Sequence, residues 1–159
     1  MKTATINELK KELAEIPPAQ LAALCLRLAK FKKDNKELLT YLLFEAHDEQ
    51  VYIDSVKTEV IDEGMQDISG DNLYNAKKRL RKILRYTTKH IKYTGSKPAE
   101  AELLIHFCKC VKETGLLRKH STALNNLYEQ QLKKIGKVIA TLHEDLQHDY
   151  QRELDRLLT

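Results

Sequence analysis

Apolar side chains recur at helical spacing along the whole chain. In the stretch 72–97 they fall on one side of a helical wheel, at Leu73, Ala76, Leu80, Ile83, Leu84, Thr87 and Ile91. The same periodicity predicts further helices over 5–16, 17–31, 34–44, 48–63, 96–114 and 121–159. Because only five glycines and three prolines interrupt these segments, the pattern indicates an all-α protein.

Several of the expected helix ends carry capping signals. The segments 5–8 and 34–37 have the form of capping boxes, Asp48 is placed to cap the helix that follows it, and Gly95 is placed to end the one before it. The stretch 51–61 is rich in β-branched residues and could form a strand. A lone strand would leave its backbone groups unpaired, so we predict a helix there.

The last helical segment is too long to lie flat on a compact body. A helix of about 38 residues would be about 57 Å long, whereas a domain of this size is about 40 Å across. We therefore expect it either to break, near Gly136 or in the polar run around His143, or to protrude over residues 143–159. In the second case its apolar spacing, which is that of a coiled-coil seam, could pair two copies of the chain as a homodimer.

These segments predict one all-helical domain over residues 1–159, built from six or seven helices. Proline-opened helices recur at Pro18 and Pro98, which favours a small array of antiparallel helices of the HEAT or armadillo kind; an irregular bundle is the alternative. The segment 96–114 is apolar around most of its circumference, so we predict that it forms the central helix.

The first third of the chain carries a resemblance. The stretch from Glu8 to Leu13, with the leucine-rich helix that leads to Ala29–Leu39, resembles an uncharacterised bacterial family of all-helical domains of unknown function. The resemblance implies a helical fold in a bacterial cytoplasm, and it implies no chemistry.

Cysteine usage and hydropathy favour a cytoplasmic protein. Cys25, Cys108 and Cys110 are odd in number and lie in apolar helical context, so we expect no disulfide framework. For Cys108 and Cys110 we expect core cysteines. No apolar run approaches the ~20 residues that span a bilayer, and the stretch 1–13 has no apolar leader segment. We therefore expect no membrane partner.

No catalytic or metal constellation stands out. His143 and His148 would lie about 140° apart on a helix, and Cys108 and Cys110 about 200° apart, so neither pair can bind one ion. No nucleophile has a recognisable context, and no glycine-rich phosphate loop is present. We expect a protein that is not an enzyme and that has no catalytic residue, metal site or cofactor.

Charge is distributed unevenly along the chain. The formal net charge is +4, but residues 45–71 carry nine Asp or Glu and one Lys, while residues 72–97 carry nine Lys or Arg and no acidic residue. If the two segments pair as antiparallel helices, Asp54, Glu59 and other acidic side chains would neutralise some of these cations. The charges would then orient helices and add little stability.

Two functions fit this distribution. The favoured one is a protein-binding module built from antiparallel helices. The alternative is nucleic-acid or other polyanion binding through the helix 77–92, whose cations would contact phosphates while tyrosines stack on unpaired bases. The residues assigned to that alternative site are Lys78, Arg79, Arg81, Lys82, Arg85, Tyr86, Lys89, Lys92 and Tyr93.

Overall fold

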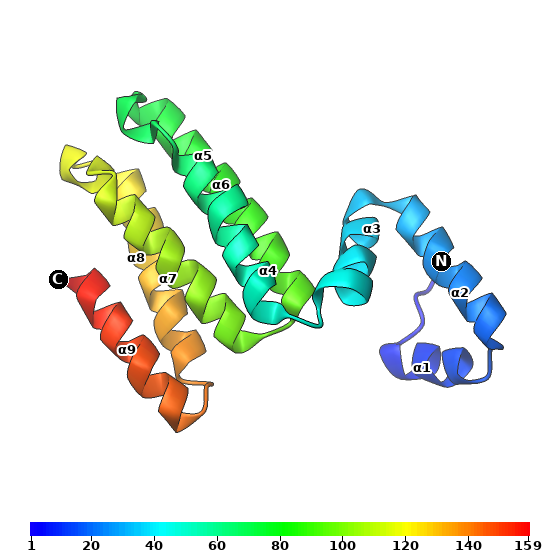
Figure 1. The fold of residues 1–159 in the computed structure, drawn as a ribbon. Helices are drawn as coiled ribbons and strands as arrows, with labels where there is room; N and C mark the ends of the chain where they lie inside the picture. Colours follow the sequence, from blue (N-terminus) through cyan, green and yellow to red (C-terminus); the bar gives the residue numbers. More distant parts are fainter. The chain divides into compact units, whose positions relative to one another are not determined.

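The computed structural model describes residues 1–159, and every regular element in it is helical. The all-α expectation is confirmed, including the helical prediction for 51–61. The chain divides into two compact units, residues 1–45 and 46–159, where the sequence led us to expect one domain. Each unit is described by itself below (Figure 1).

Unit 1, residues 1–45, consists of α1 (Ile6–Ala14), α2 (Pro18–Phe31), α3 (Lys33–Thr40) and the π-helical turn η1 (Tyr41–Glu45). The predicted capping box at 5–8 is confirmed, since Thr5 accepts from the backbone of Glu8 while the Glu8 carboxylate accepts from the backbone of Thr5. The box predicted at 34–37 is wrong. The helix begins one residue earlier than expected, at Lys33, and no side chain caps it.

Unit 1 contains almost no buried side chain. None of the residues of α1, α2 or α3 is buried, and Tyr41 is the one buried residue of η1. The stretch 38–44, which is apolar nearly all round, would be expected to be buried on more than one side. Tyr41 is buried, but Leu42, Leu43 and Phe44 are 56–66% exposed, so that expectation is wrong for these three residues.

Unit 2, residues 46–159, contains five longer helices and several short turns. The longer helices are α4 (Glu49–Val56), α6 (Leu73–Thr94), α7 (Lys97–Glu113), α8 (Thr122–Ile139) and α9 (Glu144–Leu158). The short elements are the π-helical η2 (Lys57–Asp62), the single turn α5 (Glu63–Met65), and the 3-10 turns η3 (Ile68–Gly70) and η4 (Leu116–Lys119). Helices that follow one another run antiparallel (Figure 1).

The predicted central helix is confirmed as α7. It packs against α4, η2, α6, α8 and α9. Leu103, Leu104, Phe107 and Cys108 on it are completely inaccessible to solvent. Their burial follows from the apolar character of α7 on most of its sides, because such a helix must be covered by several neighbours.

The long C-terminal segment is broken, and its second half is part of unit 2. Helix α8 ends at Ile139 and α9 begins at Glu144, so the break lies beside His143, while Gly136 lies within α8. Helix α9 packs on α7 and α8, and the Tyr128 hydroxyl donates to the backbone carbonyl of Leu157 at 3.0 Å. Residues 143–159 therefore do not protrude, and the expected count of six or seven helices is not confirmed.

Candidate functional site

The cations of the basic segment are displayed by α6, whose ends lie where the sequence indicates. The Asn72 side chain caps its first turn, and Gly95 ends it with a positive φ of 59° that suits a residue without Cβ. Ala76, Leu80, Ile83, Thr87 and Ile91 form its buried stripe. Because this stripe is narrow, most of the basic side chains point away from the core.

One stretch of α6 forms a cationic groove. It is lined by Asp71, Tyr74, Asn75, Lys77, Lys78, Arg79, Arg81, Lys82 and Arg85. Among these, Lys78, Arg81, Lys82 and Arg85 are exposed, and none of the four forms an ion pair. The groove therefore carries positive charge that no carboxylate of the chain neutralises by direct contact.

Tyr86 lies among three cations, of which two, Lys82 and Arg85, belong to the groove. The Lys82 Nζ, the Arg85 Cζ and the Lys89 Nζ are 6.0, 5.5 and 5.2 Å from the centre of its ring. The ring is 38% exposed, and cations at such distances are attracted to the face of an aromatic ring. Tyr86 thus gathers positive charge around an accessible aromatic surface.

Two of the residues assigned to the polyanion site, Arg79 and Tyr93, make contacts within the protein. Arg79 donates to Asp71 at 3.0 Å and to the backbone carbonyls of Gly64 and Gln66 at 2.8 and 2.7 Å, so it holds the loop before α6. Tyr93 is only 8% exposed, and its ring lies edge-on to that of His90. Of the two tyrosines expected to stack on bases, only Tyr86 is exposed.

The acidic segment 45–71 does not neutralise α6 in the way that the sequence suggested. Asp54 pairs with Lys57, and Asp62 contacts His106. Glu59 and Glu63 form no ion pair. Within this segment, the carboxylate of Asp71 pairs with a cation of α6, the guanidinium of Arg79. The expectation that Asp54, Glu59 and neighbouring acidic side chains would neutralise cations of α6 is therefore wrong for these residues.

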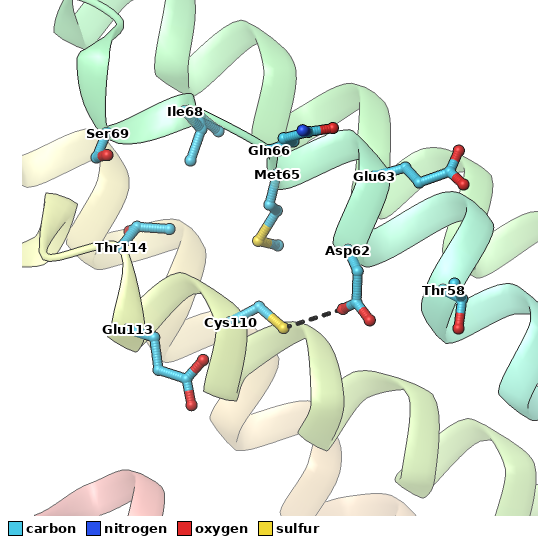
Figure 2. A pocket seen from close by; sticks show the side chains of 10 residues that line it. All are labelled: Thr58, Asp62, Glu63, Met65, Gln66, Ile68, Ser69, Cys110, Glu113 and Thr114. Carbon is cyan, nitrogen blue, oxygen red and sulfur yellow. Dashed lines mark hydrogen bonds between the residues drawn. The ribbon is translucent and has the colours of Figure 1, made fainter.

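A second group of chemically competent side chains lies between η2 and α7. Asp62, His106 and Cys110 each place one donor atom within 4.8 Å of the other two. The His106 Nε2 is 2.7 Å from the Asp62 Oδ1, and the Cys110 Sγ is 3.5 Å from that oxygen and 3.6 Å from that nitrogen. Figure 2 shows Cys110 hydrogen-bonded to Asp62, and both residues line a pocket of about 540 Å³.

The two cysteines of α7 differ in their surroundings. Cys108 is inaccessible, and its burial raises the pKa of its thiol to about 12, so the prediction of a core cysteine is confirmed for it. Cys110 is only partly buried and contacts Asp62, so the same prediction is wrong there. Burial, with added repulsion from Asp62 and Glu113, raises the pKa of the Cys110 thiol to about 12.

The sequence did not lead us to this cluster, because no histidine was compared with a cysteine. His106 and Cys110 are four residues apart and so share one face of a helix, which is a signal that the sequence does contain. The contribution of Asp62, more than forty positions earlier, depends on the packing of η2 against α7.

No protein-family model, no curated protein and no solved structure matches this chain, so the resemblance of its first third receives no support from them. None of its helices combines the length and the apolar composition needed to cross a bilayer.

Proposed function

We propose that the protein is a non-enzymatic, protein-binding module whose contact surface is the apolar face of unit 1. The observation that carries this proposal is the absence of any buried residue in α1, α2 and α3. These helices nevertheless carry exposed large apolar side chains: Ile6, Leu9, Leu13, Leu21, Leu24, Leu26, Leu28 and Phe31. Exposed apolar surface of this extent is typical of protein interaction sites.

The spacing of these side chains supports a docking role. Ile6, Leu9 and Leu13 follow one another at intervals of three and four on α1, as Leu21, Leu24 and Leu28 do on α2. Each therefore shares one helix face with its neighbours. Helices of 9 and 14 residues are marginal in water by themselves, and burying each leucine against a partner would contribute about 1.5–3 kcal/mol.

The packing of unit 2 supports a short helical array as its architecture. Its principal contacts join helices that are adjacent or next but one along the chain: α7 packs on α6 and α8, and also on α4 and α9. Contacts between helices that lie close together along the chain are typical of arrays of stacked helices.

Affinity capture tests this proposal with the triple variant Leu9→Asp, Leu13→Asp, Leu24→Asp. We expect the wild type to capture a partner protein that the triple variant does not capture. The same difference should appear when the purified partner is mixed with each purified protein. Light scattering will show whether that partner is a second copy of the chain. Leu158→Asp is the control, since Leu158 is 63% exposed in unit 2. Equal capture and equal mass for all three proteins would reject unit 1 as the contact surface.

A second candidate function is binding of a nucleic acid or another polyanion by α6. It is favoured by one specific observation, the four exposed cations of the groove without an ion pair. Lysines and arginines that neutralise phosphates release the counterions condensed on the nucleic acid, so the logarithm of the binding constant falls with the logarithm of the salt concentration by about 0.9 per contact to duplex DNA. Four contacts would weaken binding by about 100-fold between about 50 and about 200 mM salt.

Fluorescence anisotropy of labelled oligonucleotides tests this second function. The variant Arg81→Glu, Lys82→Glu, Arg85→Glu should lose binding. The matched control Lys133→Glu, Lys137→Glu, Arg152→Glu changes net charge equally at exposed positions of α8 and α9 and should retain most of it. Equal losses in both variants would show that only net charge matters, and no binding at low salt would reject the function.

A further inference from the structure

We propose that Asp62, His106 and Cys110 form a zinc-binding site that joins η2 to α7. The inference is independent of unit 1 and of the basic face of α6. It starts from three donor atoms of different chemistry, a carboxylate oxygen, an imidazole nitrogen and a thiol sulfur, all within 4.8 Å of one another. Thiolate, imidazole and carboxylate are the ligands by which proteins hold Zn²⁺.

The distances between the donors match the edges of a tetrahedral zinc site. With Zn–S of about 2.3 Å and Zn–N of about 2.0–2.1 Å, tetrahedral angles place sulfur and nitrogen about 3.5–3.6 Å apart. The Cys110 Sγ is 3.6 Å from the His106 Nε2 and 3.5 Å from the Asp62 Oδ1. Both edges that involve the sulfur therefore already have the required length.

The third edge has to open slightly on binding. The His106 Nε2 and the Asp62 Oδ1 are 2.7 Å apart, a hydrogen-bond distance, whereas a shared zinc would hold them about 3.3 Å apart. The side chain of Asp62 is 48% exposed and can make this small movement. On binding, the thiol proton leaves Cys110 for solvent, and a neutral His106 carries its proton on Nδ1 so that Nε2 is free to coordinate.

The adjoining pocket gives an ion access and a fourth coordination position. It is lined by Thr58, Asp62, Glu63, Met65, Gln66, Ile68, Ser69, Cys110, Glu113 and Thr114. Asp62, Glu63 and Glu113 supply negative charge, and no lysine or arginine lines the pocket (Figure 2). Three protein ligands and a water in the fourth position would complete tetrahedral coordination of the ion.

The π-helical backbone conformation at Asp62 is of a kind that is frequent at functional sites. Asp62 is the last residue of the π-helical segment η2. Such widened turns are uncommon within helices and are frequent at functional sites. His106 and Cys110 project from the central helix α7, so two of the three ligands are held by the best-packed element of the unit.

Cobalt substitution tests the site, because Co²⁺ takes the place of Zn²⁺ and absorbs light where zinc does not. The reduced, full-length protein is freed of metal with a chelator and titrated with Co²⁺. We expect the intense visible bands of tetrahedral cobalt, a thiolate-to-cobalt charge-transfer band in the near ultraviolet, and the loss of both when Zn²⁺ is added. An octahedral spectrum without charge transfer would overturn the proposal.

Variants assign the signal to these three residues. Cys110→Ser, which is nearly isosteric, should abolish the charge-transfer band, and Asp62→Asn and His106→Gln should each weaken Co²⁺ binding by at least about tenfold. Cys25→Ser is the matched control because Cys25 is exposed and lies in unit 1. Retention of the band in folded Cys110→Ser, or its loss in Cys25→Ser, would place the metal elsewhere and reject the site.

Thermal unfolding provides a readout that does not depend on cobalt. Excess Zn²⁺ should raise the melting temperature of the wild type and of Cys25→Ser, since a ligand that binds only the folded state stabilises it. It should leave the melting temperature of Cys110→Ser unchanged. An equal response of all three proteins to Zn²⁺ would contradict the proposal.

Discussion

Leucines and cysteines of unit 2 show how strongly burial differs between residues of one type. Leu104 is 0% exposed, whereas Leu158, near the end of α9, is 63% exposed. Cys108 and Cys110 show the same contrast two positions apart, one enclosed by the core and the other facing a carboxylate. The change in the free energy of unfolding caused by a substitution therefore depends more on how deeply the side chain is buried than on its residue type.

The Leu104→Ala substitution should lower the free energy of unfolding by about 2–5 kcal/mol, because it removes buried methyl groups and leaves a cavity in the central helix. Leu158→Ala, the exposed control, should change it by about 0.5 kcal/mol or less. Urea unfolding followed by circular dichroism measures both. A loss under about 1 kcal/mol for Leu104→Ala would mean that α7 is not the centre of the core.

The buried thiol of Cys108 should make the fold sensitive to alkali. Its pKa is raised from 9.0 to about 12 in the folded state. The unfolded chain therefore loses this proton at lower pH, and the stability is present below about pH 9 and lost as pH rises toward 12. Cys108 should account for a decrease of about 1 kcal/mol between about pH 9 and about pH 10.

Cys108→Ala isolates this effect. Urea unfolding at several pH values should show a shallower decline for this variant than for the wild type, while Cys25→Ser should follow the wild type. Identical pH dependence in all three proteins would show that the Cys108 thiol ionises as easily in the folded state as in the unfolded one.

At the scale of elements, close approach of α5 to α6 restricts the residue at position 64. A Cβ added to Gly64 would lie 2.8 Å from the Cγ1 of Ile83, which is 5% exposed and belongs to the buried stripe of α6. A β-branched side chain packed in this way has few alternative rotamers. Gly64 is therefore required by packing, unlike Gly70, around which nothing lies within 4 Å of such a Cβ.

Gly64→Ala should destabilise the protein by about 1–3 kcal/mol, because Ile83 or the backbone of α5 must move to admit the methyl group. Gly70→Ala is the matched control and should be neutral or slightly stabilising. The midpoints of urea unfolding compare the two variants. Equal stability of both would contradict the close approach of α5 to α6.

The pairing of α8 with α9 explains why the end of the chain does not form a coiled coil. Tyr128 on α8 and Leu154 on α9, two of the residues in the segment with coiled-coil spacing, are buried within one chain. Gln147 stabilises the turn beside His143 that connects α8 to α9, since its side-chain amide donates to the carbonyl of Leu142 at 2.8 Å. A seam that is satisfied internally does not require a second copy.

At the scale of the whole molecule, the two units differ in how they reach stability. Every buried apolar side chain except Tyr41 belongs to residues 46–159. Unit 1 consists of short helices without a core of their own. Apolar burial is the dominant favourable contribution to folding, so unit 2 should be stable by itself and unit 1 should not.

Separate expression of the two units checks this difference. The fragment 46–159 should unfold cooperatively in urea with its helical circular dichroism retained, and the peptide 1–45 should be largely unfolded in water. A cooperative transition for 1–45, or a fragment 46–159 without one, would show that the core is distributed differently between the units.

Local patterns in the sequence were sufficient to predict that the chain is helical and where several of its helices begin or end. The capping box at Thr5, the end of α6 at Gly95 and the central position of α7 all follow from residue spacing within a single element. Such features depend on neighbours a few residues apart, which the sequence shows directly. The exposure of Leu42 and Phe44 was not predictable, because an apolar residue is buried only if another element covers it.

The sequence by itself determined that the chain is helical, where most helices begin and end, and which face of α6 carries its charge. It did not determine which acidic side chains meet which basic ones, nor that Asp62 lies beside His106 and Cys110. Those contacts join residues far apart along the chain, and their geometry depends on how η2 packs against α7. Helical periodicity is a property of one segment, whereas a site made of distant residues exists only after the segments have packed.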